Sequence, residues 1–314
     1  MRKLIGLNKR GEMTSKQLIS VIILIVSFGI ILFFWSMFNW EGDINRETCH
    51  TSVLLRASAT FRDFQFRENI PLKCQTDRIC FKNGLFSEGC DIQGENVRKV
   101  NVGNKNELLD FVAKDIYDWH KTLGEGKVNF MERGITTKKY CFINSIYSLD
   151  ENVKKQIESE GGITYKELFE YLETKQTDQG TNYFQEIYKI KTTEDYFNEF
   201  ESFKKTNSNV KFNLNDKINF SSNDALITQT ISMGTGKSAT IGLIAVVAAV
   251  AAPFTGASSL VAGGVAIAAL GSGSYVAYWY LPDPTYPIFI PPQIIKYDVE
   301  TLSDLGCTSF ESLA

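Results

Sequence analysis

The six cysteines carry the most evident chemistry in this chain of 314 residues. They are spread over most of its length, at Cys49, Cys74, Cys80, Cys90, Cys141 and Cys307. An even number of cysteines without Cys-x-x-Cys spacing is typical of disulfides formed in an oxidising compartment. We therefore expect three disulfides, one of which ties Cys307 back to the earlier residues. The spacing alone does not choose among the pairings.

Phosphate-binding and metal-binding motifs are incomplete in this sequence. The run GTGKS at 234–238 resembles the end of a phosphate-binding loop, but Ile231 stands where the full pattern needs its first glycine. The shorter run GEGK at 124–127 is interpreted as an exposed turn. Only two histidines are present, His50 and His120, too few for the usual zinc sites. We therefore assign no cofactor and no metal ligand.

Covalent catalysis and glycosylation each have one position to consider. Cys49 beside His50 would pair a thiol with a base, but external cysteines usually oxidise and adjacent side chains seldom face each other. The sequence has no serine-hydrolase elbow, zinc-protease helix or paired acidic metal motif, so we assign no catalytic residue. Asn219 opens the sequon Asn219-Phe220-Ser221 and is the candidate glycosylation site.

An apolar run near the N-terminus predicts where these residues lie. Leu18–Phe38 holds no charged residue and as a helix would reach about 31 Å, close to the hydrocarbon thickness of a bilayer. The segment before this run contains a single acidic residue, Glu12, and five basic residues: Arg2, Lys3, Lys9, Arg10 and Lys16. This bias predicts a cytoplasmic N-terminus, a transmembrane anchor and an extracytoplasmic remainder.

Two alternatives involve processing of this N-terminus. A cleaved secretory signal needs a shorter apolar run and small residues at the cut, which the bulky FFW at 33–35 does not supply. The run KRGE at 9–12 resembles the processing site of archaeal type IV pilin-like precursors, but SKQ at 15–17 stands where such subunits often carry a glutamate. A retained anchor is the preferred interpretation.

A second uncharged stretch runs from 238 to 282 and is interrupted at Pro253, Thr255 and Gly256. This punctuation predicts a helical hairpin over 237–281 whose Ala- and Gly-rich legs can pack closely in lipid. A self-packed hairpin is the preferred interpretation, and a pore-lining or membrane-inserting element is the functional alternative. The proline-rich run after it is predicted to lie extended along a surface. Two crossings would return the acidic tail, with its single base Lys296, to the outside.

The region between the apolar runs alternates helix and strand signals, which predicts one α+β domain. Asn104 with Glu107 and Thr164 with Glu167 are helix starts. The first of these helices is expected to end at Gly124. A third helix is indicated by an aromatic stripe at Tyr196, Phe197, Phe200 and Phe203. Strands are predicted in YCFINSIYSL (140–149), VKFNLN (210–215) and ALITQTIS (225–232).

Three segments carry a family resemblance: CHTSVLLRAS, WHKTLGEGKVNF and YCFINSIYSLD. At these segments the chain resembles uncharacterised N-terminally anchored archaeal membrane proteins with a cysteine-containing extracytoplasmic domain. The resemblance implies the same topology, and it implies no activity.

These expectations combine into one architecture: an α+β extracytoplasmic domain with an N-terminal transmembrane helix and a C-terminal hydrophobic helical hairpin. The predicted ranges are a cytoplasmic basic N-terminus (1–17), the anchor helix (18–39), the α+β domain (40–236), the hairpin (237–281) and a Pro-rich acidic extracytoplasmic tail (282–314). The mixed charges, with a net of −3, argue against nucleic acid as a partner.

The predicted function is that of a non-enzymatic cell-envelope protein in the cell membrane, whose partners are the lipid bilayer and other envelope or membrane proteins. A membrane-permeabilising or transport component is the first alternative. A pilin-like surface subunit is the second. An external hydrolase would need a catalytic cluster assembled from distant residues.

Overall fold

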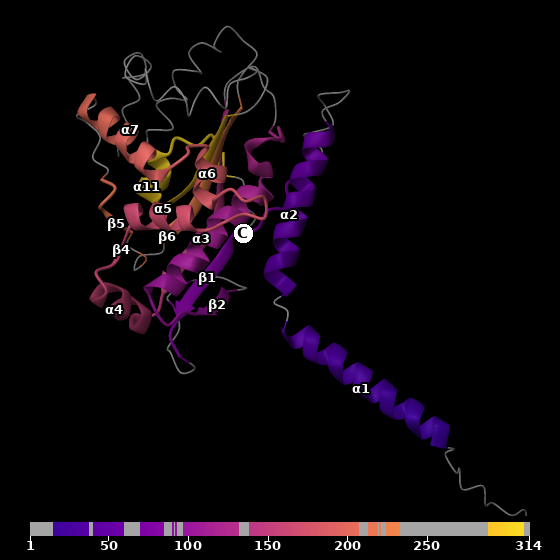
Figure 1. Ribbon diagram of the computed structural model, residues 1–314. Helices are drawn as coiled ribbons and strands as arrows, with labels where there is room; N and C mark the ends of the chain where they lie inside the picture. The colour runs from indigo at the N-terminus through magenta and orange to yellow at the C-terminus, as the bar shows by residue number, and fades with distance from the viewer. Residues whose placement is uncertain are drawn as a thin grey trace, which may run out of the picture. The chain divides into compact units, whose positions relative to one another are not determined.

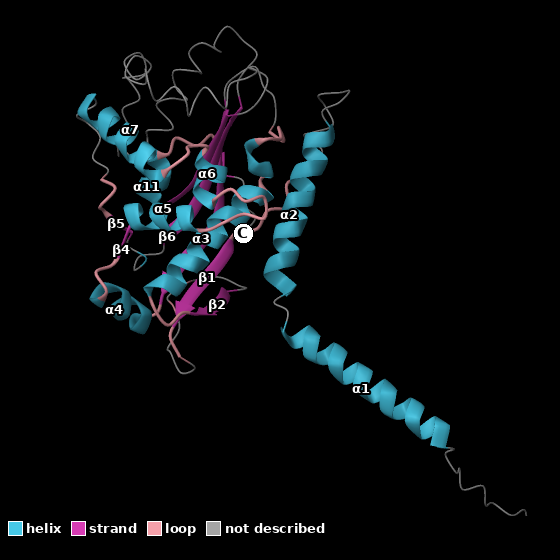
Figure 2. Cartoon of the chain, viewed as in Figure 1, coloured by secondary structure: helices cyan, strands magenta, loops and turns pink. Residues whose placement is uncertain are grey.

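The computed structural model describes residues 15–37, 40–59, 70–84, 90, 92, 97–131, 138–206, 213–218, 220, 224–232 and 288–310. The chain divides into two compact units, Met1–Asp43 and Ile44–Ala314. The second unit mixes helices with a multi-stranded sheet, as Figure 2 shows. The prediction of an α+β domain is confirmed. We call this second unit the α+β domain.

The first unit is built around helix α1 (Ser15–Met37). Its described side chains, from Ile19 to Leu32, are all exposed, and the large apolar ones range from 45% exposed at Val21 to 69% at Leu24. Within the described part of the chain, no helix combines the length and the apolar character that a membrane crossing needs.

The α+β domain contains a six-stranded sheet with the order β2-β1-β3-β6-β7, and β8 pairs with β3 beside this path. Its strands are β1 (Asp77–Lys82), β2 (Val97–Asn101), β3 (Lys138–Leu149), β6 (Asp224–Ser232), β7 (Ile288–Lys296) and β8 (Ser309–Phe310). The strands β2, β1 and β3 are parallel, whereas β6 is antiparallel to both β3 and β7. A separate two-stranded sheet joins β4 (Ile163–Thr164) to β5 (Lys217–Ile218).

Helices cover one face of the large sheet (Figure 1). They are α2 (Trp40–Ser58), α3 (Lys105–Thr122), α5 (Tyr165–Thr174), α6 (Tyr183–Tyr188) and α7 (Thr193–Thr206). The main core lies between them and the sheet, with Trp119, Phe142 and Tyr147 nearly inaccessible to solvent. A smaller core on the other face surrounds Cys141 and Ile227 and includes Leu305, which follows α11 (Val299–Asp304). Helix α4 (Glu151–Ser159) begins where β3 ends.

The predicted helix starts are confirmed in atomic detail. Asn104 accepts a hydrogen bond from the backbone N–H of Glu107 at the start of α3, which ends at Thr122, two residues before Gly124. Thr164 and Glu167 form a reciprocal capping box at the start of α5. Each pairing satisfies N–H groups that the first helical turn leaves without partners.

The strand predictions are confirmed at β3 and β6 and need two corrections elsewhere. Leu214 lies in a turn before β5 and not in a strand. The proline-rich run was expected to lie along a surface, but Phe289 and Ile290 of β7 are buried in the sheet. Its prolines, Pro291 and Pro292, fall where the β6–β7 register shifts. Because β7 is an edge strand, a missing N–H is tolerated there.

Several predicted features lie outside the described residues. They include the hairpin at 237–281, the GTGKS run at 234–238 and the glycosylation candidate Asn219. The strands that flank the hairpin region are described. Ile231 near the end of β6 lies opposite Ile288 at the start of β7.

Candidate functional site: a buried arginine–aspartate network

The most concentrated group of charges in the α+β domain surrounds Arg46 of α2. Its Nε donates to Asp77 Oδ2 at 2.9 Å and its Nη2 to the same oxygen at 2.6 Å. Nη2 also donates to Asp115 Oδ1, and Nη1 donates to Asp118 Oδ2 at 3.3 Å. One guanidinium thereby joins α2 to the first residue of β1 and to two turns of α3. We call these four residues the Arg46 network.

Neutral side chains complete the surroundings of Asp115. Ser145 Oγ and Tyr147 OH, both on β3, donate to Asp115 Oδ2 at 2.6 and 2.7 Å. Trp119 Nε1 donates to Ser145 Oγ at 3.0 Å, and the Arg46 guanidinium lies 5.2 Å from the centre of the Trp119 ring. Asp115 is 2% exposed, so its carboxylate relies on these protein donors.

Burial and ion pairing act against each other in this network. Burial alone would lower the pKa of Arg46, but the charges of Asp115 and Asp77 outweigh it and raise the pKa above its ordinary value. Burial raises the pKa of Asp77, and the Arg46 charge offsets only part of that effect. Burial, followed by the Asp115 charge, holds the pKa of Tyr147 well above its ordinary value. Tyr147 is therefore a fixed hydrogen-bond donor.

The geometry suits a structural joint better than a reaction centre. Both oxygens of Asp115 already accept hydrogen bonds from Arg46, Ser145 and Tyr147, which leaves little capacity to bind a substrate or to take its proton. Within the described ranges, no three His, Cys, Asp or Glu side chains gather as metal ligands. The absence of a cofactor stays a prediction.

All six cysteines are joined in three disulfides, as the sequence predicted. The pairs are Cys49–Cys74, Cys80–Cys90 and Cys141–Cys307. The first joins α2 to the segment before β1, and the second joins β1 to the residues that follow it. The third connects the central strand β3 with the tail, the link that was expected for Cys307.

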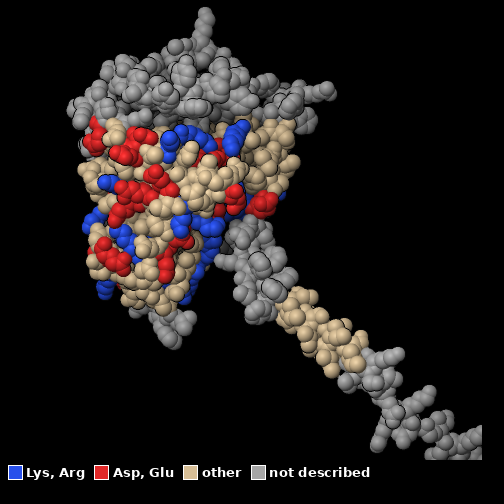
Figure 3. Space-filling model, in the orientation of Figure 1, with Lys and Arg blue, Asp and Glu red and all other residues tan. Residues whose placement is uncertain are grey.

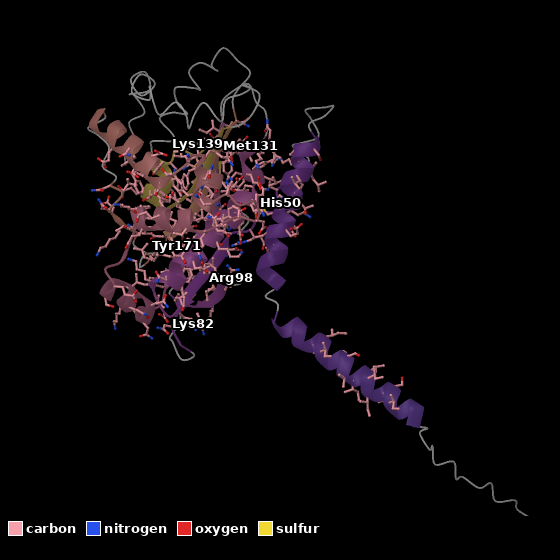
Figure 4. The ribbon with its side chains drawn as sticks, viewed as in Figure 1. His50, Lys82, Arg98, Met131, Lys139 and Tyr171 are labelled. Carbon is pink, nitrogen blue, oxygen red and sulfur yellow. A yellow bond between two sulfur atoms is a disulfide. The ribbon has the colours of Figure 1, made fainter. Side chains whose placement is uncertain are left out.

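The other residues that the sequence analysis considered for chemistry, the two histidines, Cys49 and the GEGK run, are held in contacts that stabilise the fold. The Cys49 sulfur is in a disulfide, and the His50 Nδ1 lies 2.9 Å from the Thr122 carbonyl oxygen, so the thiol–base pair does not form. Figure 4 labels His50 on α2. His120 is fully buried and packs edge-on against Phe289. The GEGK run is a tight turn, as predicted, but it is not fully exposed: Gly124 is buried, and the exposed Lys127 is paired with Glu125.

Sequence reasoning missed the Arg46 network because it treated charged residues as exposed. One signal was present. The predicted apolar stripe of α3 contains Val112 and Trp119, and Asp115 stands three residues after the first and four before the second. Helical geometry places Asp115 on that same buried face. An acid there requires a partner, although no pattern indicates that the partner is Arg46.

Comparisons with known proteins give no relative. No protein-family model, curated protein or solved structure matches this chain.

Proposed function

We propose that this chain is a non-enzymatic, membrane-anchored cell-envelope protein whose disulfide-stabilised α+β domain binds a partner or contributes to surface structure. The observation that carries the proposal is the pairing of all six cysteines. Disulfides persist in oxidising compartments and are rare in the cytosol. A domain with three disulfides is therefore suited to the outside of a cell.

The anchor in this proposal is the apolar run at 18–39, most of which lies in α1. The support is its composition, its basic N-terminal flank and the exposure of every described side chain from Ile19 to Leu32. An exposed run of large apolar side chains is unfavourable in water and favourable in lipid.

The sheet supports an external tail. Since Ile231 and Ile288 are paired neighbours, the residues between them begin and end at the same place. If the uncharged stretch crosses a bilayer, an even number of crossings returns β7 and Cys307 to the side of β6. The disulfide from Cys307 to Cys141 agrees with that arrangement.

Cell fractionation combined with cysteine labelling tests the proposal. Intact cells are treated with a membrane-impermeant protease, and the membrane fraction is alkylated without reduction and analysed by mass spectrometry. We expect the chain in the membrane fraction, the α+β domain cleaved from outside, and the three observed pairs intact. Free thiols at Cys141 or Cys307 in a protease-protected domain would refute the proposal.

A membrane-permeabilising or transport component is the second candidate. It is supported by the uncharged stretch 238–282, which lies between the end of β6 at Ser232 and the start of β7 at Ile288. Purified protein would be added to dye-loaded liposomes beside a variant in which a short turn replaces 233–287. Leakage that depends on this stretch would favour the second candidate. The pilin-like surface subunit stays a further alternative, and N-terminal sequencing for cleavage after Gly11 tests it.

A further inference from the structure

The segment around Cys307 is held against β3 by Lys139. The Lys139 Nζ donates a hydrogen bond to the carbonyl oxygen of Leu305, two residues before Cys307. The Lys139 backbone N–H donates to Thr308 Oγ1 at 3.1 Å, and the Thr308 N–H donates to the Lys139 carbonyl oxygen at 2.7 Å. Lys139 therefore contacts the chain on both sides of Cys307.

The Lys139 side chain shares a face of the sheet with the disulfide Cys141–Cys307. Side chains alternate along a strand, so Lys139 and Cys141 point to the same face, with their Cα atoms about 7 Å apart. Leu305, whose carbonyl oxygen accepts from the Lys139 Nζ, packs with Cys141 in the smaller core. The Lys139 ammonium and the disulfide are therefore neighbours.

This ammonium differs from the cations on the surface. Lys and Arg side chains reach the solvent over much of the visible face of the α+β domain in Figure 3. Lys139, labelled in Figure 4, is partly buried, and burial lowers its pKa from 10.5 to about 8. It stays mostly protonated at pH 7. Because the attraction between charges is stronger away from water, a thiolate at Cys141 would gain much from this ammonium.

The two cysteines of this disulfide differ in exposure. Cys141 is fully buried, whereas Cys307 is partly exposed. In thiol–disulfide exchange, the attacking thiolate must reach one sulfur, and the other sulfur leaves faster when its own thiol has a lower pKa. A neighbouring cation lowers that pKa. Cys307 is therefore the sulfur open to attack, and Cys141 is the leaving group.

We propose that Cys307 is a thiol–disulfide exchange site for a low-molecular-weight thiol and that Lys139 stabilises the departing Cys141 thiolate. The thiolate of the small molecule attacks Cys307 Sγ and forms a new S–S bond, while the bond between Cys307 and Cys141 breaks. The electron pair of the broken bond stays on Cys141 Sγ, and Cys307 carries the mixed disulfide. The inference goes beyond the proposed function, because it requires the disulfide but not the membrane anchor.

Exchange at Cys307 would loosen the tail from the sheet. Strand β8 pairs with β3 only through Ser309 and Phe310, so the disulfide is the covalent link that holds this short ladder in place. Without it, the tail would rely on the Lys139 hydrogen bonds and on the packing of Leu305. A small thiol would thus control how firmly the tail is attached to the central strand.

Glutathionylation of the purified full chain tests the proposal. The oxidised protein is incubated with glutathione at pH 7, quenched with acid, alkylated with N-ethylmaleimide in denaturant and mapped by mass spectrometry. We expect glutathione on Cys307 and the alkyl group on Cys141. The disulfide Cys49–Cys74, whose cysteines are both buried, should react about tenfold more slowly. Glutathione chiefly on Cys141, or equal rates for the two disulfides, would overturn the proposal.

Variants separate the charge of Lys139 from its contacts with the tail. K139M should slow exchange at Cys307 about threefold for each unit by which the pKa of the leaving thiol rises. K139R keeps the positive charge and should retain the wild-type rate. K138M is the matched control, because Lys138 lies on the opposite face of β3, and it should leave the rate unchanged. Faster exchange in K139M would show that Lys139 only fastens the tail and would contradict its role in exchange.

The pH dependence of exchange gives a second readout. The described neighbours of Lys139, which are Ile231 of β6 and Leu305 and Thr308 of the tail, do not titrate. Because the ammonium itself loses its proton near pH 8, the ratio of the wild-type rate to the K139M rate should fall toward one between pH 7 and pH 9. The thiolate fraction of glutathione changes both rates equally. A constant ratio over this range would refute the role of the ammonium.

Discussion

Arg46 of α2 and Asp115 of α3 form a buried ion pair, although 69 residues separate them in the sequence. The Arg46 side chain is 12% exposed and that of Asp115 is 1% exposed. The pair connects the first helix of the α+β domain to the main core, and the disulfide Cys49–Cys74 lies three residues farther along α2.

Replacing Arg46 with Met should destabilise the domain by about 3–5 kcal/mol, because Asp115 would remain buried without its cation. Urea unfolding measures the change. Asp118→Asn is the matched control, since the Asp118 side chain is 29% exposed and its pair should contribute about 1 kcal/mol or less. Equal small effects of both substitutions would show that the network does not hold α2.

Asp224 should make the domain less stable as the pH rises. Burial raises the pKa of its carboxyl from 3.8 to about 7, and the Lys296 charge offsets this effect only in part. Between these pH values the folded carboxyl keeps a proton that the unfolded chain releases, so stability falls as the pH rises. Asp224→Asn should remove this contribution, so the stability that the variant gains over the wild type should grow as the pH rises and reach roughly a few kcal/mol at pH 8. Unfolding free energies measured from pH 4 to pH 8 test this.

His120 should make the domain more stable as the pH rises, the opposite of the effect of Asp224. Burial, followed by the charges of Lys189 and Lys127, lowers its pKa from 6.5 to about 3. Between these values only the unfolded chain binds the proton, so stability falls as the pH falls. The opposing slopes of His120 and Asp224 should nearly cancel between about pH 4 and pH 6.5. His120→Phe should reveal the Asp224 slope there, and a flat profile in that variant would contradict the assignment.

The disulfide Cys141–Cys307 should contribute more stability than Cys80–Cys90. Their sequence separations are 166 and 10 residues, which correspond in the chain-entropy model to about 5 and about 3 kcal/mol. Paired Cys→Ala variants compared by denaturant unfolding would measure the difference. An equal loss for both pairs would indicate that loop closure is not the main source of stabilisation.

Local patterns predicted local structure well in this chain. Asn104 and Thr164 were assigned as helix starts because a capping side chain and its target are only three residues apart. The strand β7 was missed because its prolines contradict a strand, and only the register shift opposite them makes room. The Arg46 network joins residues that are distant in sequence, and a single sequence gives no information on such pairs. The disulfides lay between these cases: their number could be predicted and their connectivity could not.

The central strand β3 has a consequence for the order of events during synthesis. It receives β1 from earlier in the chain but β6, β7 and β8 from later. Cys141 of β3 therefore cannot meet Cys307 until the 166 residues that separate them in the sequence have been made. Contacts so distant in sequence form slowly. The domain should thus reach its native state only after β7 and β8 have been made, so a truncated product lacking these strands would leave β6 as an open edge that is prone to aggregation.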